Sequence, residues 1–451
     1  MRNFSHKMSI ICYNFEYSAE MRRVKANRRK SAEDDSCHVF GRNLRALLLQ
    51  NPQRCEIILA IDPGFTNGCK CAVIDIHGDP KETFILYLNR RSEMKRKLES
   101  IIQTYHIDLI GIGDGKGCRE TEKLVAELIQ NSKYTSKTHF CRVREAGVSI
   151  YSCSPIGLED LPKYEPGERS AISLGRRVLN PVGELVKVSP EHLGIGQYQH
   201  DISQKKLNDA LTQVVEECVS YIGVDLNSSG IHLLSKVCGL NNARAAAIVQ
   251  YRIKNGTIKS RDELRKIKGI GPKSFQQAAG FLRIYNGAEK LDSTWIHPES
   301  YDLAKKFIKR LNSSTVKIGT ANLIKKSEEC SSDIMADLIS ECENDKSVTK
   351  DNLKMIQSAF EQREDNLRTG RDIIFRKTLL ERNDLKINHE VIGQVMNTTS
   401  FGSFVDIGLD KDGLIHSSKS NGIELQPNQS VLVVIESING DRIGLRLRKL
   451  L

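Results

Sequence analysis

Five short apolar runs between residues 57 and 143 constrain the fold of this chain more than any other feature. The first three are separated only by the Gly-containing turns GFTNG and HGD, which predicts three consecutive strands. Helix-like stretches are expected at about 92–105, 119–131 and 168–179. The five runs are IILAID (57–62), CAVIDI (71–76), TFILYL (83–88), LIGIGDG (109–115) and THFCRV (138–143).

The order of these elements is that of a ribonuclease H-like domain, with three strands followed by alternating helices and strands. In that fold the first and fourth strands are neighbours. We therefore expect Asp62 and the residues just after Ile112 to meet at one edge of the sheet. A carboxylate at the end of a buried strand costs free energy, so its position needs a structural or chemical explanation.

Carboxylates near this edge are candidates for a metal-dependent hydrolytic site. Two-metal hydrolysis needs about three or four convergent carboxylates. The helix at 168–179 begins with Glu168, then carries Arg176 and Arg177, with no further acid before Glu184. Two arginines where a carboxylate is needed favour a vestigial site over an active nuclease. The candidate catalytic residues, all vestigial under this interpretation, are Asp62, Asp114, Glu120 and Glu145.

Positive charge is concentrated in one block. The chain has a formal net charge of +11, and residues 226–287 carry eleven Lys and Arg against two Asp and Glu. Such a concentration is typical of a surface that binds a polyanion, whereas a merely soluble surface mixes the two signs.

The same block contains LRKIKGIGPKSFQQAAGFLRI (264–284), which predicts a helix-hairpin-helix. Glycines let the turn bend and approach a ligand closely, and the amides of the following helix form an anion site. A partial second copy, VCGLNNARAAAIV (237–249), keeps one glycine and has Asn241 in place of the other. The alternative is a helical hairpin that packs against the rest of the protein and binds no ligand. The candidate backbone-binding residues are Gly239, Lys266, Lys268, Gly269, Gly271, Lys273 and Ser274.

From residue 389 the apolar period changes to two, in the segments VIGQV, SFVDI, GLIHS, VLVVIES and RIGLRLR. Five short strands within about 60 residues predict a small β-barrel. The alternation places Val405 and Ile407 in the core, with Phe404 and Asp406 outside. Exposed aromatic, His and Arg side chains on one sheet face suit base stacking and phosphate pairing. The candidate residues on this face are Phe401, Phe404, His416 and Arg446.

These signals predict a multidomain α/β plus α plus β chain. Residues 1–19 show no period, whereas residues 21–50 are rich in helix formers. No apolar stretch is long enough to cross a membrane, and the scattered cysteines suggest reduced thiols inside the cell. The basic segment 22–30 leaves nucleus and cytoplasm open. The expected domains are 1–53 (disordered start and residual helical segment), 54–185 (ribonuclease H-like), 186–225 (helical connector), 226–287 (tandem helix-hairpin-helix), 288–386 (helical linker) and 387–451 (barrel).

Taken in this order, the segments resemble the Tex family of transcription-accessory proteins and their eukaryotic S1 RNA-binding-domain relatives. The matching stretches include AIDPGFTNGCKCAVID, ERSAISLGRRVLNPVGELVKV, GIGQYQHDISQKKL, GIGPKSFQQAAGFLRI and FGSFVDIG. The resemblance implies a YqgF-type domain, a tandem helix-hairpin-helix and an S1-type OB-fold. That family also has a large helical N-terminal region, of which only about 21–50 is matched, so we expect an N-terminally truncated chain.

We therefore expect a nucleic-acid-binding protein that acts in transcription or RNA metabolism. RNA is the first expected partner and DNA the second, with the transcription machinery implied by the resemblance. No cofactor and no structural metal site are expected. One alternative is a metal-dependent nuclease or resolvase, which would require Mg²⁺. The other is a translation-associated mRNA-binding factor, because barrels of this type also occur in translation proteins.

Overall fold

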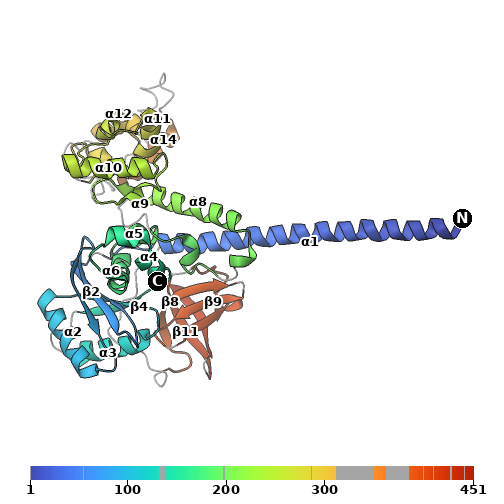
Figure 1. Cartoon of the computed structure of the whole chain (residues 1–451), viewed down its shortest axis with the longest axis horizontal. Helices are drawn as coiled ribbons and strands as arrows, with labels where there is room; N and C mark the ends of the chain where they lie inside the picture. Colours follow the sequence, from blue (N-terminus) through green and yellow to red (C-terminus); the bar gives the residue numbers. More distant parts are fainter. Residues whose placement is uncertain are drawn as a thin grey trace.

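The structure is a computed structural model in which four parts are arranged around the end of one long helix (Figure 1). A sheet domain and a barrel lie side by side, and a block of short helices lies on the other side of that helix. The structure describes residues 2–53, 55–131, 138–196, 199–285, 287–310, 349–361, 385–399, 401–409, 411–426, 429–440 and 442–451. The predicted linker 288–386 therefore falls partly outside the described residues.

The first helix, α1, spans Arg2–Leu48 and projects from the body of the molecule (Figure 1). The prediction that residues 1–19 have no regular structure is therefore wrong, since the helix begins at Arg2. Only its last turns enter the core, where Leu44 and Leu48 are fully buried. Residues 19–30 are exposed on every side. Without a core to cover, this part of the helix has no apolar stripe to read from the sequence.

The predicted ribonuclease H-like sheet is present, and its strand order is β3-β2-β1-β4-β5. β1 pairs in parallel with β4, with Ile61 opposite Ile112, so the expected edge is formed. The third strand begins three residues earlier than the sequence predicted. The strands are β1 (Ile57–Asp62), β2 (Cys69–Asp75), β3 (Pro80–Leu86), β4 (Leu109–Gly113) and β5 (His139–Val143).

Helices cover both faces of this sheet. α2 (Arg91–Tyr105) and α3 (Cys118–Asn131) bury their apolar faces on one side. α6 packs on the other side so closely that a Cβ atom at Gly175 would lie 2.4 Å from Ile74. The next four helices after β5 in the chain are α4 (Val148–Cys153), α5 (Pro155–Asp160), α6 (Pro166–Leu179) and α7 (Pro181–Leu185).

A separate apolar core joins the end of α1 to α8 (Gln204–Ile222) and to the block of short helices beyond it. A two-stranded ladder, β6 with β7, closes this block. Its elements are β6 (Val224–Asp225), α9 (Ile231–Leu234), α10 (Asn242–Asn255), η4 (Arg261–Lys266), α11 (Pro272–Ala278), η5 (Ala279–Phe281) and β7 (Leu282–Arg283). After η6 (Lys290–Ser293) and η7 (Pro298–Ser300), α12 (Tyr301–Arg310) and α14 (Lys350–Glu361) share a further small core.

The predicted C-terminal barrel is confirmed as a closed five-stranded sheet in the order β10-β12-β11-β8-β9. Alternate residues fill its interior, including Val405, Ile415 and Leu445. Its strands are β8 (Glu390–Thr399), β9 (Gly402–Asp406), β10 (Gly413–His416), β11 (Ser430–Asn439) and β12 (Arg442–Leu450).

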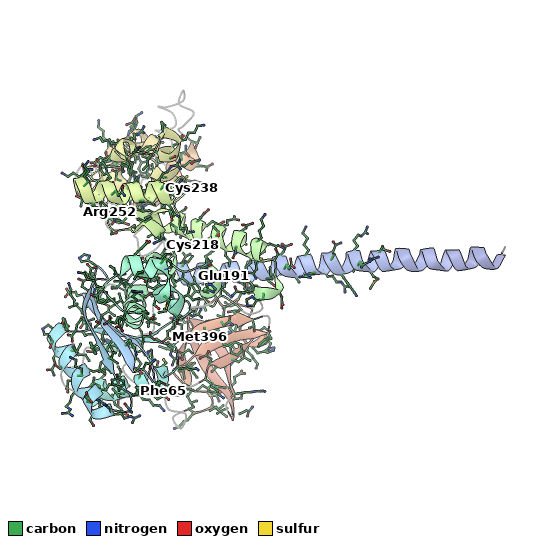
Figure 2. All side chains as sticks on the ribbon, viewed as in Figure 1. Phe65, Glu191, Cys218, Cys238, Arg252 and Met396 are labelled. Atoms are coloured by element: carbon green, nitrogen blue, oxygen red, sulfur yellow. The ribbon has the colours of Figure 1, made fainter. Side chains whose placement is uncertain are left out.

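The barrel is docked on the sheet domain through buried charges. Arg142 on β5 donates to both carboxylate oxygens of Glu122, at 3.1 and 2.8 Å, and contacts the Asp406 carboxylate at 3.1 Å. Arg119 donates to the carbonyl of Gly408 at 2.7 Å, and Arg144 donates to the carbonyl of Met396. Figure 2 shows Met396 where the barrel adjoins the sheet domain. The prediction that Asp406 is exposed is therefore wrong: it points out of the barrel and is only 2% exposed.

Two findings bear on the chemistry of the described residues. None of their helices is both long and apolar enough to cross a bilayer. Their cysteines are free of disulfide bonds, including the neighbouring pair Cys69 and Cys71, which are both buried.

Candidate nucleic-acid interface

The two predicted hairpin turns have the same local structure, thirty residues apart. Gly239 and Gly269 both adopt positive φ, at +83° and +94°. Two residues after each of these glycines a helix is capped: Asn241 is the N-cap of α10 and Gly271 is the N-cap of α11. Asn241 accepts a hydrogen bond from the Arg244 amide, which a glycine cannot do. The side-chain cap explains why the first turn tolerates Asn where the second has glycine.

Arg244 ties the two turns together. Its Nε donates to the carbonyl of Gly269 at 3.0 Å, and its Nη1 donates to the carbonyl of Gly239 at 2.9 Å. One guanidinium therefore fixes both loops at a set spacing. This role could not be predicted from the sequence, since nothing in a basic block indicates which arginine will donate hydrogen bonds to main-chain carbonyls.

The glycines of the two turns differ in what surrounds them. A Cβ atom at Gly239 would lie 2.7 Å from Gln277, so this glycine allows close contact with α11. No atom of the described residues lies within 4 Å of such a Cβ at Gly271, which leaves open space for a phosphate. Ser274, by contrast, is only 8% exposed and is not placed to contact a ligand from solvent.

Only part of the positive charge of this block faces solvent. Lys266, Lys268 and Lys273 are exposed around the second turn. Four of the eleven basic residues have internal roles, each bonded to main-chain carbonyls: Arg244, Arg252, Arg261 and Arg283. The excess of nine positive charges therefore overstates the charge available to a polyanion.

Arg261 joins the hairpin block to the segment that follows it. The side chain is 1% exposed and donates to the carbonyls of Leu282 at 2.8 Å and Ile296 at 2.7 Å. Its Nη1 also donates to the Tyr301 hydroxyl at 2.7 Å, and that hydroxyl donates to Asp292 at 2.5 Å. The hairpins and the start of α12 therefore form one connected unit.

The residues of the predicted aromatic face lie together on the barrel, but Phe404 is half-buried and not fully exposed as predicted. The rings of Phe401 and Phe404 lie edge to face, with centroids 6.0 Å apart, and Phe401 is 49% exposed. His416 is exposed on β10, opposite Gly402 on β9. The parallel register of β10 and β12, with Ile415 beside Leu445, places Arg446 next to His416. Arg446 also pairs with Glu436 at 3.2 Å, which lowers its availability for phosphate.

At the sheet edge, Asp62 and Glu145 form a pair of carboxyl groups. Burial is the main cause that raises the pKa of Asp62 to about 6 and that of Glu145 to about 7. The charge of Asp62 raises the pKa of Glu145 further. A Cβ atom at Gly113 or Gly115 would lie about 2 Å from a Glu145 carboxylate oxygen, so both glycines make room for this side chain.

The other candidate carboxylates do not complete a metal site. Asp114 accepts the Glu145 amide at 2.8 Å, and Glu120 is exposed in the first turn of α3. Arg176 points away, donating to the carbonyl of Gly78, while Arg177 donates to the carbonyls on either side of Glu145. Among the residues that the structure describes, no three His, Cys, Asp or Glu side chains are grouped to hold a metal.

Replacing Asp62 by asparagine is expected to stabilise the fold at pH 8. A carboxyl group whose folded pKa is raised makes the free energy of unfolding fall as pH rises through that pKa, here between about 4 and 7. Removing the charge should raise the free energy of unfolding by roughly 1–2 kcal/mol at pH 8, after allowing for partial solvent exposure. Chemical denaturation at pH 5 and pH 8 measures this.

Glu120→Gln provides the control, because it removes a carboxylate from the exposed start of α3. It should not raise the free energy of unfolding at pH 8. If Asp62→Asn is no more stable than the parent protein at pH 8, burial of this carboxylate is not a cost to the fold.

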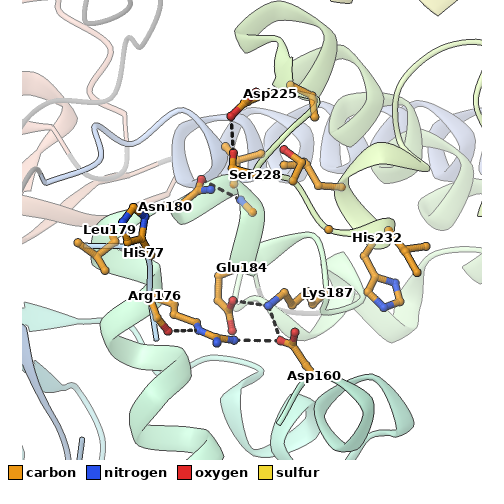
Figure 3. A pocket seen from close by; sticks show the side chains of 18 of the residues that line it. His77, Asp160, Arg176, Leu179, Asn180, Glu184, Lys187, Asp225, Ser228 and His232 are labelled. Atoms are coloured by element: carbon orange, nitrogen blue, oxygen red, sulfur yellow. Dashed lines mark hydrogen bonds and ion pairs between the residues drawn. The ribbon is translucent and has the colours of Figure 1, made fainter. Parts of the chain in front are cut away.

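A cleft of about 1000 Å³ lies between the sheet domain and the hairpin block (Figure 3). Four of its charged side chains pair with one another: Asp160 contacts Arg176 at 3.1 Å and Lys187 at 2.6 Å, and Lys187 contacts Glu184 at 2.7 Å. Because these four charges balance, and Glu159 and Asp225 add negative charge to the lining, the cleft offers little attraction for a phosphate chain.

The sheet domain and the hairpin block both match known protein families. Residues 56–179 match the Tex protein YqgF-like domain, and residues 219–283 match the helix-hairpin-helix motif. A transcriptional accessory protein Tex from Neisseria gonorrhoeae is 38% identical over 415 residues, which are 90% of this chain and 52% of that protein. Over most of its length, the chain is therefore Tex-like.

Two further relatives give the same result for this Tex-like chain. The S1 RNA-binding domain-containing protein 1 of Homo sapiens is 34% identical over 495 residues, covering 96% of this chain and 49% of the human protein. The uncharacterized protein YdcI of Bacillus subtilis is 38% identical over 406 residues, covering 88% of this chain and 55% of that protein. The chain spans about half the length of the curated relatives it matches.

One part of the Tex-like chain was not predicted from the sequence. Residues 289–351 match an HHH domain. The sequence had predicted only a helical linker for this segment. Residues 311–348 of this match lie outside the described residues. The start of the matched segment is held to the hairpin block by the Arg261 contacts with Ile296 and Tyr301.

Proposed function

We propose that this Tex-like chain is a nucleic-acid-binding protein that acts in transcription or RNA metabolism. The observation that carries the proposal is the pair of matching hairpin turns, which Arg244 holds together through the carbonyls of Gly239 and Gly269. A fixed pair of turns suits the regular spacing of phosphates along a duplex better than a mobile loop does.

The hairpins are proposed to hold the sugar-phosphate backbone without reading bases. Gly271 leaves room for a phosphate at the start of α11, and Lys266, Lys268 and Lys273 supply charge around it. Contacts to phosphate carry no sequence information, so affinity for this surface should depend on salt and not on base composition.

The barrel is proposed to hold single-stranded RNA. Its exposed Phe401 and His416 and half-buried Phe404 offer ring faces for stacking, which every base can use. The human relative is named for an S1 RNA-binding domain, and the closed five-stranded barrel here is the matching architecture. The paired state of Arg446 with Glu436 makes stacking the larger contribution.

The double variant Phe404→Ala/His416→Ala is expected to weaken binding of single-stranded RNA by about tenfold or more, since each lost base stack costs about 1–3 kcal/mol. Binding of duplex DNA should be unchanged, because the hairpins are untouched. Fluorescence anisotropy with a labelled oligouridine and with a labelled duplex measures both affinities.

The matched control is Ile392→Ala/His389→Ala, which removes an exposed apolar residue and an exposed histidine elsewhere on the barrel. It should bind both ligands as the parent does. Unchanged RNA affinity in the Phe404/His416 variant would remove the barrel from the proposal, and failure of the parent to bind any nucleic acid would refute the function.

The proposed partners are RNA, DNA and the transcription machinery, the last suggested by the Neisseria relative's name, transcriptional accessory protein. A metal-dependent nuclease is the alternative that Asp62 and Glu145 keep open. It predicts Mg²⁺- or Mn²⁺-dependent cleavage that Asp62→Asn abolishes. A translation-associated mRNA-binding factor is the other alternative, and crosslinking in cells that recovers mainly nascent transcripts would count against it.

A further inference from the structure

The sheet domain carries a basic and aromatic surface that none of the roles above uses. It lies along β3, which is an edge strand of the five-stranded sheet, and continues onto the start of α2. We call it the β3–α2 surface, formed by Phe65, Tyr87, Arg90, Arg91 and Arg96. A groove runs along it between the end of β3 and α2.

Two aromatic rings stand out from this surface. Phe65 is 56% exposed and Tyr87 is 40% exposed. Figure 2 places Phe65 at the end of the domain away from the hairpin block. Gly68 lies against Tyr87, and a Cβ atom there would be 3.0 Å from the tyrosine ring. The loop that carries Phe65 is therefore held against the end of β3, and it begins directly after Asp62.

Positive charge surrounds the rings. Residues 85–97 contain five Lys or Arg and a single acid, Glu93. Lys95 pairs with Glu127 and Lys97 with Glu82, so the three arginines supply the charge of this surface. The Arg90 guanidinium lies 5.5 Å from the centre of the Tyr87 ring and 3.5 Å from Glu93. Arg91 and Arg96 are exposed, and the Nε of Arg96 donates to the carbonyl of Ser92 at 3.3 Å. Aromatic faces set among arginines suit stacked bases with phosphates alongside.

The position of Phe65 favours a nucleic-acid strand over a peptide. A peptide that added to the free edge of β3 would cover Ile85 and Tyr87 but would leave Phe65, on a different loop, unused. Phe65 instead lies beside Gly117, two residues before Arg119, whose guanidinium bonds to the barrel carbonyl of Gly408. The surface therefore continues towards the docked barrel.

We propose that the β3–α2 surface is an additional binding site for single-stranded nucleic acid, in which Phe65 and Tyr87 stack on bases and the arginines contact phosphates. The proposal rests on the proposed function, since it gives a strand that leaves the barrel a second place to bind. It also assigns the Asp62 loop a binding role that requires no metal and no hydrolysis.

The test uses the full chain with its other two surfaces weakened by Lys266→Glu, Lys268→Glu, Lys273→Glu, Phe404→Ala and His416→Ala. Residual affinity for a labelled oligouridine is measured before and after adding Phe65→Ala/Tyr87→Ala or Arg90→Glu/Arg96→Glu. Each pair should lower residual affinity at least about fivefold. In the unmodified chain, photo-crosslinking with bromouridine-substituted RNA should label the peptides that contain Phe65 or Tyr87.

The controls make the same chemical changes elsewhere. Ile150→Ala/Leu158→Ala removes two exposed apolar side chains of the same domain, and Lys163→Glu/Lys205→Glu reverses two exposed lysines. Neither should alter residual affinity, and thermal unfolding checks that every variant is folded.

Residual affinity that is unchanged by both test pairs would overturn the proposal while leaving the hairpin and barrel functions in place. A parent chain that binds no nucleic acid would overturn both. Binding of a polyglutamate peptide in place of the oligouridine would overturn the proposal in favour of an acidic peptide.

Discussion

Replacing Arg142 by leucine is expected to lower the free energy that holds the barrel on the sheet domain by about 3 kcal/mol. Arg142 neutralises two buried carboxylates, Glu122 on α3 and Asp406 on β9, which are 0% and 2% exposed. Removing one partner of a buried ion pair typically costs 3–5 kcal/mol, because the remaining charge stays in a medium of low dielectric constant. Arg119, which lies 3.5 Å from Glu122, should offset part of that cost.

Hydrogen exchange is the suitable measurement, since a chain with several domains does not unfold in a single step. Amides of β8 and β9 should lose protection in Arg142→Leu, while those of α8 and α10 should not. Arg142→Lys keeps the charge without the two-point contact and should give a smaller effect. Full protection of β9 in the leucine variant would mean that the barrel is held by other contacts.

Reversing the charge of Lys266, Lys268 and Lys273 together is expected to weaken duplex binding on the order of a hundredfold at 0.1 M salt. Each phosphate that a protein neutralises contributes about 0.9 to the slope of log affinity against log salt concentration. Losing three such contacts should therefore lower the slope by about 2.7, which corresponds to a few hundredfold in affinity at 0.1 M salt.

A matched variant makes this result specific. Lys254→Glu, Lys259→Glu and Lys290→Glu produce the same change in net charge at three other exposed lysines. If the hairpin turns are the site, this control should lose far less affinity and keep most of the salt slope. Equal losses in the two variants would instead indicate a general electrostatic effect.

The parts of the fold with a regular apolar period could be predicted from the sequence. The strands of the sheet and the five-stranded barrel follow from such patterns, and the order of the elements gives the adjacency of Asp62 to β4. The start of α1 could not be predicted, since residues 1–19 show no apolar period that would mark a helix.

Contacts between domains were the least predictable. The alternation in SFVDIG places Asp406 outside the barrel, which is right, but no local pattern reveals that Arg142 covers it there. Likewise, the count of basic residues in the hairpin block cannot distinguish exposed lysines from Arg261, which is buried and bonded to carbonyls far along the chain. Long-range hydrogen bonds of this kind depend on the tertiary structure.

The sequence placed the carboxylates of the sheet edge but not their roles. Glu145 was one of four candidates, and the structure makes it the partner of Asp62 because Gly113 and Gly115 leave space for its side chain. Asp114 instead accepts a main-chain amide. Such a division of roles follows from side-chain direction, which a one-dimensional pattern does not contain.

The central claim, that the paired hairpin turns bind nucleic-acid backbone, is tested most directly by the salt dependence of duplex binding. The unmodified chain is titrated with a labelled duplex of about 20 base pairs, long enough for several phosphate contacts, at a series of salt concentrations. A linear plot of log affinity against log salt, with a slope of about −2.7 or steeper and no dependence on base sequence, is the predicted result. A slope near zero, or no measurable binding at low salt, would contradict it.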